Sequence, residues 1–336
     1  MNNTLNFNTS KAFAILLGLS LGISGCGTQA NTQTSVSSQV TPQTVPPAQT
    51  EQAAIQPNQN SLTRLKIAFP SRKDSTDLQR KADTVAKFLA SDLGIPVEAI
   101  VSDETAAVEA LKADRVDVAF LSTRPALKAE QLANSKLYLA EVRNNYSGGY
   151  TYKSIIVVPK DSPLQPKDNP KETLAQLQGK KMTFTSPSSG SGFIFPVGEL
   201  VKLGLVPNRD SLNKFFSQVS YGDGYSGALK AVLRGQSDVA AVSEYALNTP
   251  YITEEEVKQL RVLHAIEGVP AHGVVIDDDV PTQMREKIIN AMLKLNQPEN
   301  NQMLRELYNS TELVKVDGDK HLQPMRTALK DAGMEP

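Results

Sequence analysis

The segment that decides the fold is Met182–Phe193, which reads MTFTSPSSGSGF. Met182–Thr185 has the apolar character of a short buried strand, and Gly192–Leu203 has the apolar spacing of a helix. Between them, five of the eight residues 185–192 carry hydroxyl groups and two are glycines. A strand that passes through a Ser/Gly turn into a helix is the repeating unit of an α/β fold, so this segment predicts that class.

Outward from this segment, strands and helices alternate along the chain. Short apolar runs predict strands, and apolar residues three and four apart predict helices. The predicted strands are 65–69, 97–101, 116–121, 138–142, 153–158, 182–185, 215–219, 239–242 and 274–276, and the predicted helices are 76–93, 104–113, 125–133, 174–177, 192–203, 227–233 and 285–295. Two successive series of this kind predict two α/β lobes, each a mostly parallel sheet flanked by helices, with a ligand cleft between them.

The Ser/Gly turn predicts an oxyanion site. Its glycines allow backbone N–H groups to approach a ligand, and the first turn of the following helix presents N–H donors and a partial positive charge. Together with the hydroxyls, these groups could hold an oxyanion without lysine or arginine. The alternative is a plain helix cap, which needs only one hydroxyl. The turn lacks the Gly-Lys-Ser/Thr of a nucleotide-binding P-loop.

Residues 1–26 have the features of a bacterial lipoprotein signal peptide. Lys11 precedes the apolar run Ala12–Gly25, which is shorter than a membrane span of about 20 residues. The run ends in ISGC, which resembles a lipobox, and Cys26 is the only cysteine among 336 residues. Cys26 is therefore predicted to carry the lipid. The alternative is an ordinary signal peptide with a chance cysteine.

Residues 27–62 are predicted to form a flexible tether. They are rich in Gln, Thr, Ser, Asn and Pro, with Glu51 as the one charged residue and no aromatic residue. Such a composition cannot bury enough apolar surface to fold. The remaining residues are numerous enough for two lobes, and a net charge of −1 gives no basis for nucleic-acid binding.

Further motifs occur in the order and spacing of one family. They are Glu109–Leu111 with Val116–Phe120, Gly149–Tyr152 with Lys160–Pro163, Ser189–Phe193 with Pro196, and Gly224–Val232 with Asp238–Ala240. Through these motifs, most of the chain after the tether resembles the phosphonate/phosphite-binding proteins of ABC importers, a branch of the type II periplasmic-binding fold. The resemblance implies a monomeric two-lobed binding protein without a cofactor, a small phosphorus oxyanion as ligand, and ABC permease subunits as partners.

The resemblance also implies the ligand-binding residues. Ser189, Gly190 and Ser191 fall on the family's hydroxyl-rich phosphonate loop. The middle position of that loop is often Thr, so at Gly190 the contact would come from the backbone N–H. Ser188, directly before these residues, is included in the expected site, and Tyr152 falls on a ligand-facing tyrosine.

Other positions of the implied site leave the identity of the ligand open. Glu244 lies near an acidic residue that meets the amino group of aminoalkylphosphonates. A family histidine is replaced by Tyr225, an acidic or polar position by His272, and a tyrosine by Glu104. Glu244, Tyr225 and His272 complete the expected ligand-binding set. Phosphite and small alkylphosphonates lead as ligands, followed by aminoalkylphosphonates and then by phosphate or sulfate.

The remaining polar residues do not predict catalysis or a metal site. His264 and His321 have no supporting neighbours in the sequence and are expected to be surface or packing residues. Asp277–Asp279 is expected to be a solvated turn rather than a calcium site. The loop serines lack the Gly-x-Ser-x-Gly pattern of a nucleophile elbow, so an enzyme is not expected.

The sequence as a whole predicts a lipid-anchored substrate-binding protein on the periplasmic or cell-surface side of a bacterial membrane. Its predicted parts are a signal peptide at 1–26, a tether at 27–62, lobe 1 at 63–157 plus 276–336, and lobe 2 at 158–275. Two alternatives stay open: a lipoprotein of the same fold that senses a ligand for a membrane kinase, and a hydrolase on a similar fold.

Overall fold

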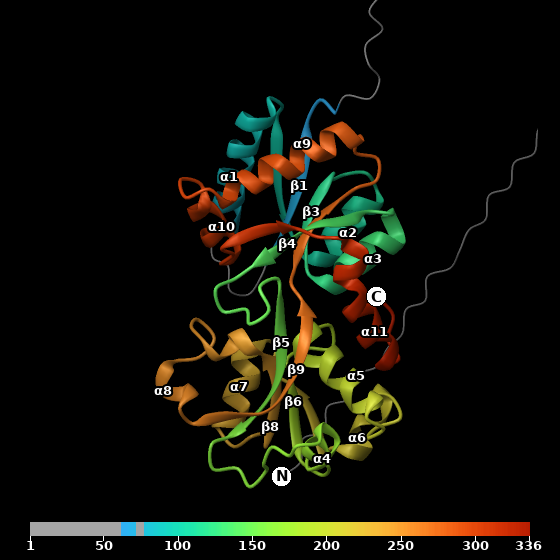
Figure 1. The fold of residues 1–336 in the computed structure, drawn as a ribbon, viewed down its shortest axis with the longest axis vertical. Helices are drawn as coiled ribbons and strands as arrows, with labels where there is room; N and C mark the ends of the chain where they lie inside the picture. The colour runs from blue at the N-terminus through green and yellow to red at the C-terminus, as the bar shows by residue number, and fades with distance from the viewer. Residues whose placement is uncertain (1–61, 72–76) are drawn as a thin grey trace, which may run out of the picture. The chain divides into compact units, whose positions relative to one another are not determined.

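The computed structural model describes residues 62–71 and 77–336 (Figure 1). The predicted signal peptide, its Cys26, and the predicted tether up to residue 61 lie outside the described residues. Within the described ranges, no helix is both long enough and apolar enough to cross a membrane.

The first sheet has six strands in the order β11-β4-β10-β3-β1-β2. Their bounds are β1 Leu65–Pro70, β2 Val97–Ser102, β3 Val118–Leu121, β4 Lys136–Val142, β10 Gly273–Ile276 and β11 Glu312–Lys315. β1 pairs in parallel with β2 and β3, whereas β10 runs antiparallel to β3 and β4, and β11 runs antiparallel to β4.

Helices cover both faces of this first sheet. They are α1 Leu78–Leu93, α2 Glu104–Lys112, α3 Thr123–Ala133, α9 Thr282–Leu293, the short η4 Lys294–Asn296, α10 Asn301–Tyr308 and α11 Gly318–Asp331. Ile67 and Phe120 pack with α1, α9 and α10, while their strand neighbours Ala68 and Ala119 pack with α2 and α3. Because successive strand residues point to opposite faces, a sheet covered on both faces needs the continuous apolar runs that the sequence shows.

The second sheet has five strands in the order β7-β6-β8-β5-β9. Their bounds are β5 Thr151–Pro159, β6 Lys181–Phe184, β7 Gln218–Tyr221, β8 Val239–Ser243 and β9 Leu260–Pro270. β6 pairs in parallel with β7 and β8, whereas β5 runs antiparallel to β8 and β9.

Helices also flank the second sheet on both faces. They are α4 Pro170–Ala175, η1 Gly190–Ile194, α5 Phe195–Lys202, η2 Arg209–Ser211, α6 Leu212–Phe215, α7 Tyr225–Leu233, η3 Glu244–Leu247 and α8 Glu254–Val257. Val157 and Ala240 pack with α7, whereas Ile156 and Ala241 pack on the opposite face with α5. Figure 1 shows α7 and α5 on the two sides of β5 and β9.

The chain passes between the two sheets twice, and the positions of both passages differ from the predicted boundaries between the lobes. Residues 143–150 connect β4 to β5, so the change of sheet comes before residue 151 rather than after residue 157. Residues 271–272 connect β9 to β10, so residues 273–275 belong with the first sheet. The sheets are mixed rather than mostly parallel, because β5, β10 and β11 run in the opposite direction to their neighbours.

The C-terminal helix α11 packs on elements of both sheets. It contacts α3 and β4 beside the first sheet, and α5 and β9 beside the second. Gly198 of α5 approaches it so closely that an added Cβ would lie 3.0 Å from the Ala328 carbonyl oxygen. His321 of α11 is buried, and its Nε2 donates to the Ala271 carbonyl oxygen at 2.9 Å, at the second passage. Burial lowers the pKa of His321, so this histidine acts as a neutral packing residue, as predicted.

Candidate oxyanion site

The Ser/Gly turn follows β6 and becomes the π-helical turn η1, which runs directly into α5. Ser189 caps this turn: its Oγ accepts the Gly192 N–H at 3.1 Å, and its carbonyl oxygen accepts the Ile194 N–H at 2.9 Å. Single π-helical turns within helices are frequent at functional sites. The N–H groups of Gly190 and Ser191 occupy the first positions of the helix, where no intrahelical acceptor is available.

Thr185 fixes the base of the turn, and its side chain explains why position 192 is a glycine. The Thr185 N–H donates to the Gly192 carbonyl oxygen at 3.3 Å, and the Thr185 carbonyl oxygen accepts the Gly224 N–H at 3.2 Å. An added Cβ at Gly192 would lie 2.6 Å from Thr185 Cγ2 and still closer to its Oγ1. Gly224, with φ at 118°, leads into α7. The beginnings of η1 and α7 are therefore held side by side at the carboxyl ends of β6 and β7 in the second sheet.

A chain of hydroxyl groups lies at this edge. The Ser191 side chain is fully buried, and its Oγ lies 3.0 Å from the Tyr225 hydroxyl oxygen. The Tyr245 hydroxyl donates to the Tyr225 hydroxyl oxygen at 3.1 Å, and the Ser154 hydroxyl donates to the Ser191 carbonyl oxygen at 2.6 Å. Ser191, Tyr225 and Tyr245 follow β6, β7 and β8, so they gather at the carboxyl ends of parallel strands, where α/β sheets bind ligands.

Five tyrosine rings surround these hydroxyls. Tyr152 stacks on Tyr146 with ring centroids 5.0 Å apart and lies 5.2 Å from Tyr245. The Tyr225 ring meets Tyr245 and Tyr251 edge-on, each at 5.5 Å. We refer to these five residues as the tyrosine cluster. Such tilted and edge-on pairs are favourable arrangements of aromatic rings, so the cluster holds its hydroxyls in fixed positions.

The buried tyrosine hydroxyls are hydrogen-bond donors. Burial raises the pKa of Tyr152 well above its ordinary value, and the neighbouring Tyr225 raises it further; the Ser191 hydrogen bond and the charge of Arg143 act in the opposite direction. Burial likewise raises the pKa of Tyr245 well above its ordinary value. Both phenols therefore keep their protons at neutral pH and remain hydrogen-bond donors.

Arg143 places a positive charge against the tyrosine cluster. Its side chain is 4% exposed, and its guanidinium carbon lies 5.4 Å from the Tyr245 ring centroid and 5.8 Å from that of Tyr146. Its Nη2 lies 3.6 Å from Glu141 Oε2, which also accepts the Ser310 hydroxyl at 2.8 Å. Nothing in the sequence predicts the burial of this residue, because an arginine after a strand is exposed in most proteins.

The Glu244 carboxylate accepts hydrogen bonds from the first passage of the chain and from the start of β5. Its Oε1 accepts the Ser147 N–H at 3.0 Å, the Ser147 hydroxyl at 2.8 Å and the Lys153 N–H at 3.0 Å. This carboxylate oxygen therefore ties the segment before β5 to the end of β8, and it positions the neighbouring Tyr152. Glu104 has a similar role elsewhere, because its two carboxylate oxygens accept the N–H and the hydroxyl of Ser122 at the start of α3.

The other predicted residues lie around this group. Ser188 is exposed, with its Oγ 3.3 Å from Ser186 Oγ, and an added Cβ at Gly190 would lie 2.9 Å from Met325 Cε of α11. His272 is half-buried at the second passage, and its carbonyl oxygen accepts the Glu141 N–H at 2.8 Å. The structure thus brings Tyr152, Ser191 and Tyr225 together, with Ser189 and Gly190 next to them in the loop. Tyr245, Tyr146, Tyr251 and Arg143 are the residues that sequence reasoning missed.

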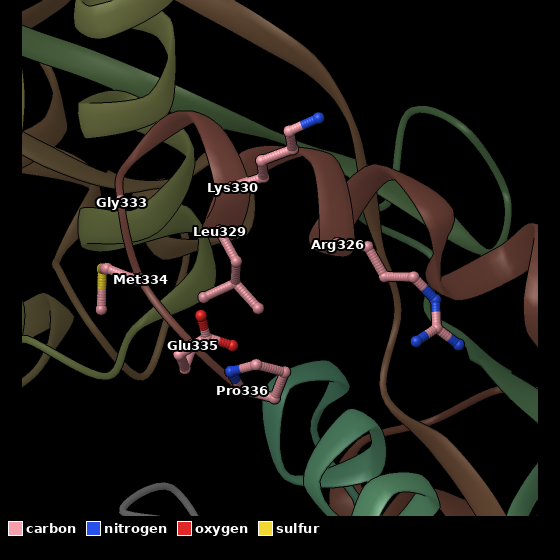
Figure 2. A pocket seen from close by; sticks show the side chains of 7 residues that line it. All are labelled: Arg326, Leu329, Lys330, Gly333, Met334, Glu335 and Pro336. Atoms are coloured by element: carbon pink, nitrogen blue, oxygen red, sulfur yellow. The ribbon is translucent and has the colours of Figure 1, made fainter.

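Two surface depressions lie away from the tyrosine cluster. The larger, of about 380 Å³, is lined by Arg326, Leu329, Lys330, Gly333, Met334, Glu335 and Pro336. Figure 2 shows the Leu329 side chain directed toward Glu335 and Pro336, and that of Lys330 directed away from them. Arg326 Nη2 lies 2.6 Å from Glu130 Oε2, so this charge is already paired. The second depression, of about 200 Å³, is lined by Glu130, by residues 136–138 and by residues 316–319.

The acidic run Asp277–Asp279 lies at the end of β10. Within the described part of the chain, no group of three or more His, Cys, Asp or Glu side chains is arranged to hold a metal ion. Asp277 is 2% exposed, and its Oδ1 accepts the Asp278 N–H at 2.8 Å. Burial, followed by the nearby carboxylates of Asp279, Asp278 and Asp114, raises the pKa of Asp277 to about 7.

The protein has two sheets flanked by helices, and the chain passes between them twice. Hydroxyl groups gather at the ends of parallel strands, where such folds bind ligands. These are the features of a two-lobed substrate-binding protein. Residues 67–322 match the model of one family, which is described as "ABC transporter, phosphonate, periplasmic substrate-binding protein". The chain therefore belongs to the phosphonate-binding periplasmic substrate-binding proteins of ABC transporters, a family of transport components. The predicted family and the two-lobed α/β fold class are confirmed, with mixed rather than mostly parallel sheets.

Individual relatives agree with this assignment. The phosphonates-binding periplasmic protein of Escherichia coli (strain K12) is 28% identical over 267 residues, which cover 78% of this chain and 75% of that protein. The phosphate-import protein PhnD of Mycolicibacterium smegmatis is 25% identical over 226 residues, covering 66% of this chain and 68% of that protein. The structure of PhnD1 from Prochlorococcus marinus with methylphosphonate has the same fold, with a TM-score of 0.63, 20% identity, and coverage of 81% of this chain and 98% of that one.

Proposed function

We propose that this protein captures phosphite or a small alkylphosphonate and delivers it to an ABC permease. The observation that carries the proposal is the hydroxyl chain Ser191–Tyr225–Tyr245 beside the first residues of η1. Hydrogen bonds from O–H and N–H groups to an ionised oxygen are shorter and stronger than neutral ones, and they strengthen further where water is excluded. A phosphorus oxyanion offers three acceptor oxygens to such donors.

The proposed ligand donors are the hydroxyls of Tyr152, Ser189, Ser191 and Tyr225 and the backbone N–H of Gly190. Capping and ligand binding are compatible at Ser189, because a hydroxyl oxygen can accept from Gly192 N–H while its proton is donated elsewhere. Ser191 and Tyr225 share a hydrogen bond in the described structure, so an entering anion would take the place of one of its partners.

The outer residues Ser188, Glu244 and His272 complete the proposed site. Glu244 contributes by holding Ser147 and Lys153, and it can also face a substituent of the ligand through its second oxygen. Ser188 and His272 are more accessible than Ser191, and we assign them to the entrance of the site.

Calorimetric titration with phosphite, methylphosphonate, 2-aminoethylphosphonate and phosphate tests the proposal. We expect tightest binding of phosphite or methylphosphonate. Absence of binding by all four anions would remove the proposed function. Tightest binding of phosphate would support the second candidate, a phosphate-binding protein, which the name of the Mycolicibacterium smegmatis relative favours.

We also propose that Cys26 carries a lipid, that residues 27–62 form a tether, and that the mature protein is a monomer on the periplasmic or cell-surface side of the membrane. The apolar run before Cys26 and the polar composition after it support this part of the proposal. Fractionation of cells after globomycin treatment tests it, because blocked lipoprotein processing should leave a longer precursor.

A further inference from the structure

Ser243 carries a buried hydroxyl that is not among the proposed ligand donors. It is the last residue of β8 and is fully buried, and its Oγ has no hydrogen-bond partner among residues 62–71 and 77–336. An unpaired buried donor costs free energy, so most buried hydroxyls in proteins have a partner. The presence of a serine at this position therefore requires a physical reason.

Two common structural roles of a buried serine do not apply to Ser243. It directly precedes η3, at the position where a serine often caps a helix, but its side chain makes no capping bond. A buried serine can instead donate to a nearby carbonyl oxygen, as Ser154 does to that of Ser191 at 2.6 Å. Within the part of the chain that the structure describes, Ser243 Oγ makes neither kind of bond.

The Ser243 side chain points toward the oxyanion loop. Ala241, two residues earlier in β8, belongs to the buried cluster that contains Phe193 and Ile194 of η1, and β8 contacts η1. Val242 belongs to the cluster on the opposite face, with α7. Because successive side chains of a strand point to opposite faces, Ser243 lies on the face of Ala241, beneath η1.

The neighbours of Ser243 on this face belong to the candidate site. Ser154 lies directly opposite on β5, and its hydroxyl bonds the Ser191 carbonyl oxygen. Tyr152, two residues before Ser154, and Tyr245, two residues after Ser243, pack with ring centroids 5.2 Å apart. Opposite residues of antiparallel strands have Cβ atoms about 4.5–5.5 Å apart, so Ser243 lies within reach of these groups.

We propose that the Ser243 hydroxyl is a further donor to the bound oxyanion, beside that of Ser191. The inference rests on the proposed function and adds one residue to its ligand-binding set. A phosphorus oxyanion at this place would supply the acceptor that Ser243 Oγ lacks among the described residues. Binding would then remove the cost of burying this donor unpaired, and the bond to an ionised oxygen would be a strong one.

The test combines two measurements on Ser243→Ala in the whole mature protein. Calorimetric titration with methylphosphonate, and with phosphite as a second probe, measures affinity, and thermal melts without ligand measure stability. Ser243→Ala removes a donor to the ligand, so affinity should fall about tenfold or more. It removes no hydrogen bond within the described residues, so the melting temperature should equal or exceed that of wild type.

Ser237→Ala is the matched control. Ser237 is also buried and lies just before β8, at the opposite end of the strand from Ser243, and its hydroxyl bonds that of Thr183. We therefore expect Ser237→Ala to have a lower melting temperature and wild-type affinity. Ser243→Cys fills nearly the same space as serine with a weaker donor, and it should lose affinity in the same direction as Ser243→Ala if the alanine variant does not fold.

The outcomes separate this inference from the proposed function. If wild-type protein binds neither methylphosphonate nor phosphite, the proposed function fails and the inference falls with it. If wild-type protein binds these anions and Ser243→Ala binds them equally well, the inference alone is overturned. A loss of affinity in Ser243→Ala no larger than that in Ser237→Ala would also overturn it.

Discussion

Ser189 and Ser191 are neighbours in the loop, but their hydroxyls have different partners, and this difference provides a sharp test of the site. Ser191→Ala removes the hydroxyl that meets Tyr225, whereas Ser189→Ala removes the one that caps η1 through Gly192. If Ser191 donates to a bound oxyanion, losing that charge-assisted bond should cost about 1.5–3 kcal/mol of binding free energy, or roughly tenfold to more than a hundredfold in affinity.

The two variants should differ in stability in the reverse order. Without Ser189 Oγ, the Gly192 N–H loses its cap, which should lower the free energy of unfolding by about 1 kcal/mol. Ser191→Ala loses its bond to Tyr225, but the Tyr225 hydroxyl keeps its bond from Tyr245, so we expect a smaller loss, of about 0.5 kcal/mol.

The measurements are calorimetry with methylphosphonate and thermal melts of the same proteins without ligand. Ser191→Ala should show the larger loss of affinity and Ser189→Ala the larger drop in melting temperature. Wild-type affinity in Ser191→Ala, together with a lowered melting temperature, would show that this hydroxyl is structural and would refute the assignment of the site.

Three other predictions follow from single residues. Burial raises the pKa of Asp277 from 3.8 to about 7, so the free energy of unfolding should fall as the pH rises between those values. Asp277→Asn should remove this fall. In chemical denaturation it should be more stable than wild type at pH 8, by up to about 4 kcal/mol, and equally stable at pH 3.5. Gly192→Ala should push the Thr185 side chain away from the turn and lower the melting temperature by several degrees. Gly235 has open space around it but a φ of 67°, so Gly235→Ala should lower the free energy of unfolding by only about 1 kcal/mol and should lower the melting temperature less. Cys26→Ser should leave the precursor uncleaved, and mass spectrometry that finds a mature N-terminus elsewhere would contradict the lipid anchor.

Local sequence patterns predicted the elements whose structure depends on near neighbours. The strand β6, the turn after it and the helix beyond were all visible in Met182–Leu203. The π-helical start of that helix was not, because the same residue spacing fits an α-helix. The close approach of Gly192 to Thr185 and of Gly190 to Met325 also depends on residues outside the turn.

Elements that depend on distant partners were missed. The longest strand, β9, includes Arg261, His264 and Glu267, which obscure its apolar pattern. It forms because it pairs with β5, about a hundred residues earlier in the chain, and no local feature reports that pairing. α10, β11 and α11 were missed as well; α11 carries Pro324 within it, a residue that usually argues against a helix.

The same distinction applies to the site. Ser191 was predicted from the hydroxyl-rich turn and the family resemblance, and Tyr225 from the resemblance alone, but the burial of Arg143 could not be predicted. An arginine is buried only where its charge and its donors find partners, and the rings of Tyr146 and Tyr245 come from different parts of the chain. Tyr245 was overlooked although it adjoins Glu244, because a tyrosine after a strand is a common packing residue.

The first passage of the chain carries residues of the proposed site, so the proposal connects ligand binding with the segment between the sheets. Arg143 and Tyr146 lie in the passage, Ser147 is held there by Glu244, and Tyr152 begins the strand that follows. In the proposed site, an anion that takes Ser191 and Tyr225 as donors would alter the bond between Tyr225 and Tyr245, whose ring packs against Tyr146 and Arg143. The occupied and empty sites would then differ in the forces on the segment that joins the two sheets, which is the physical requirement for a ligand to bias their relative arrangement.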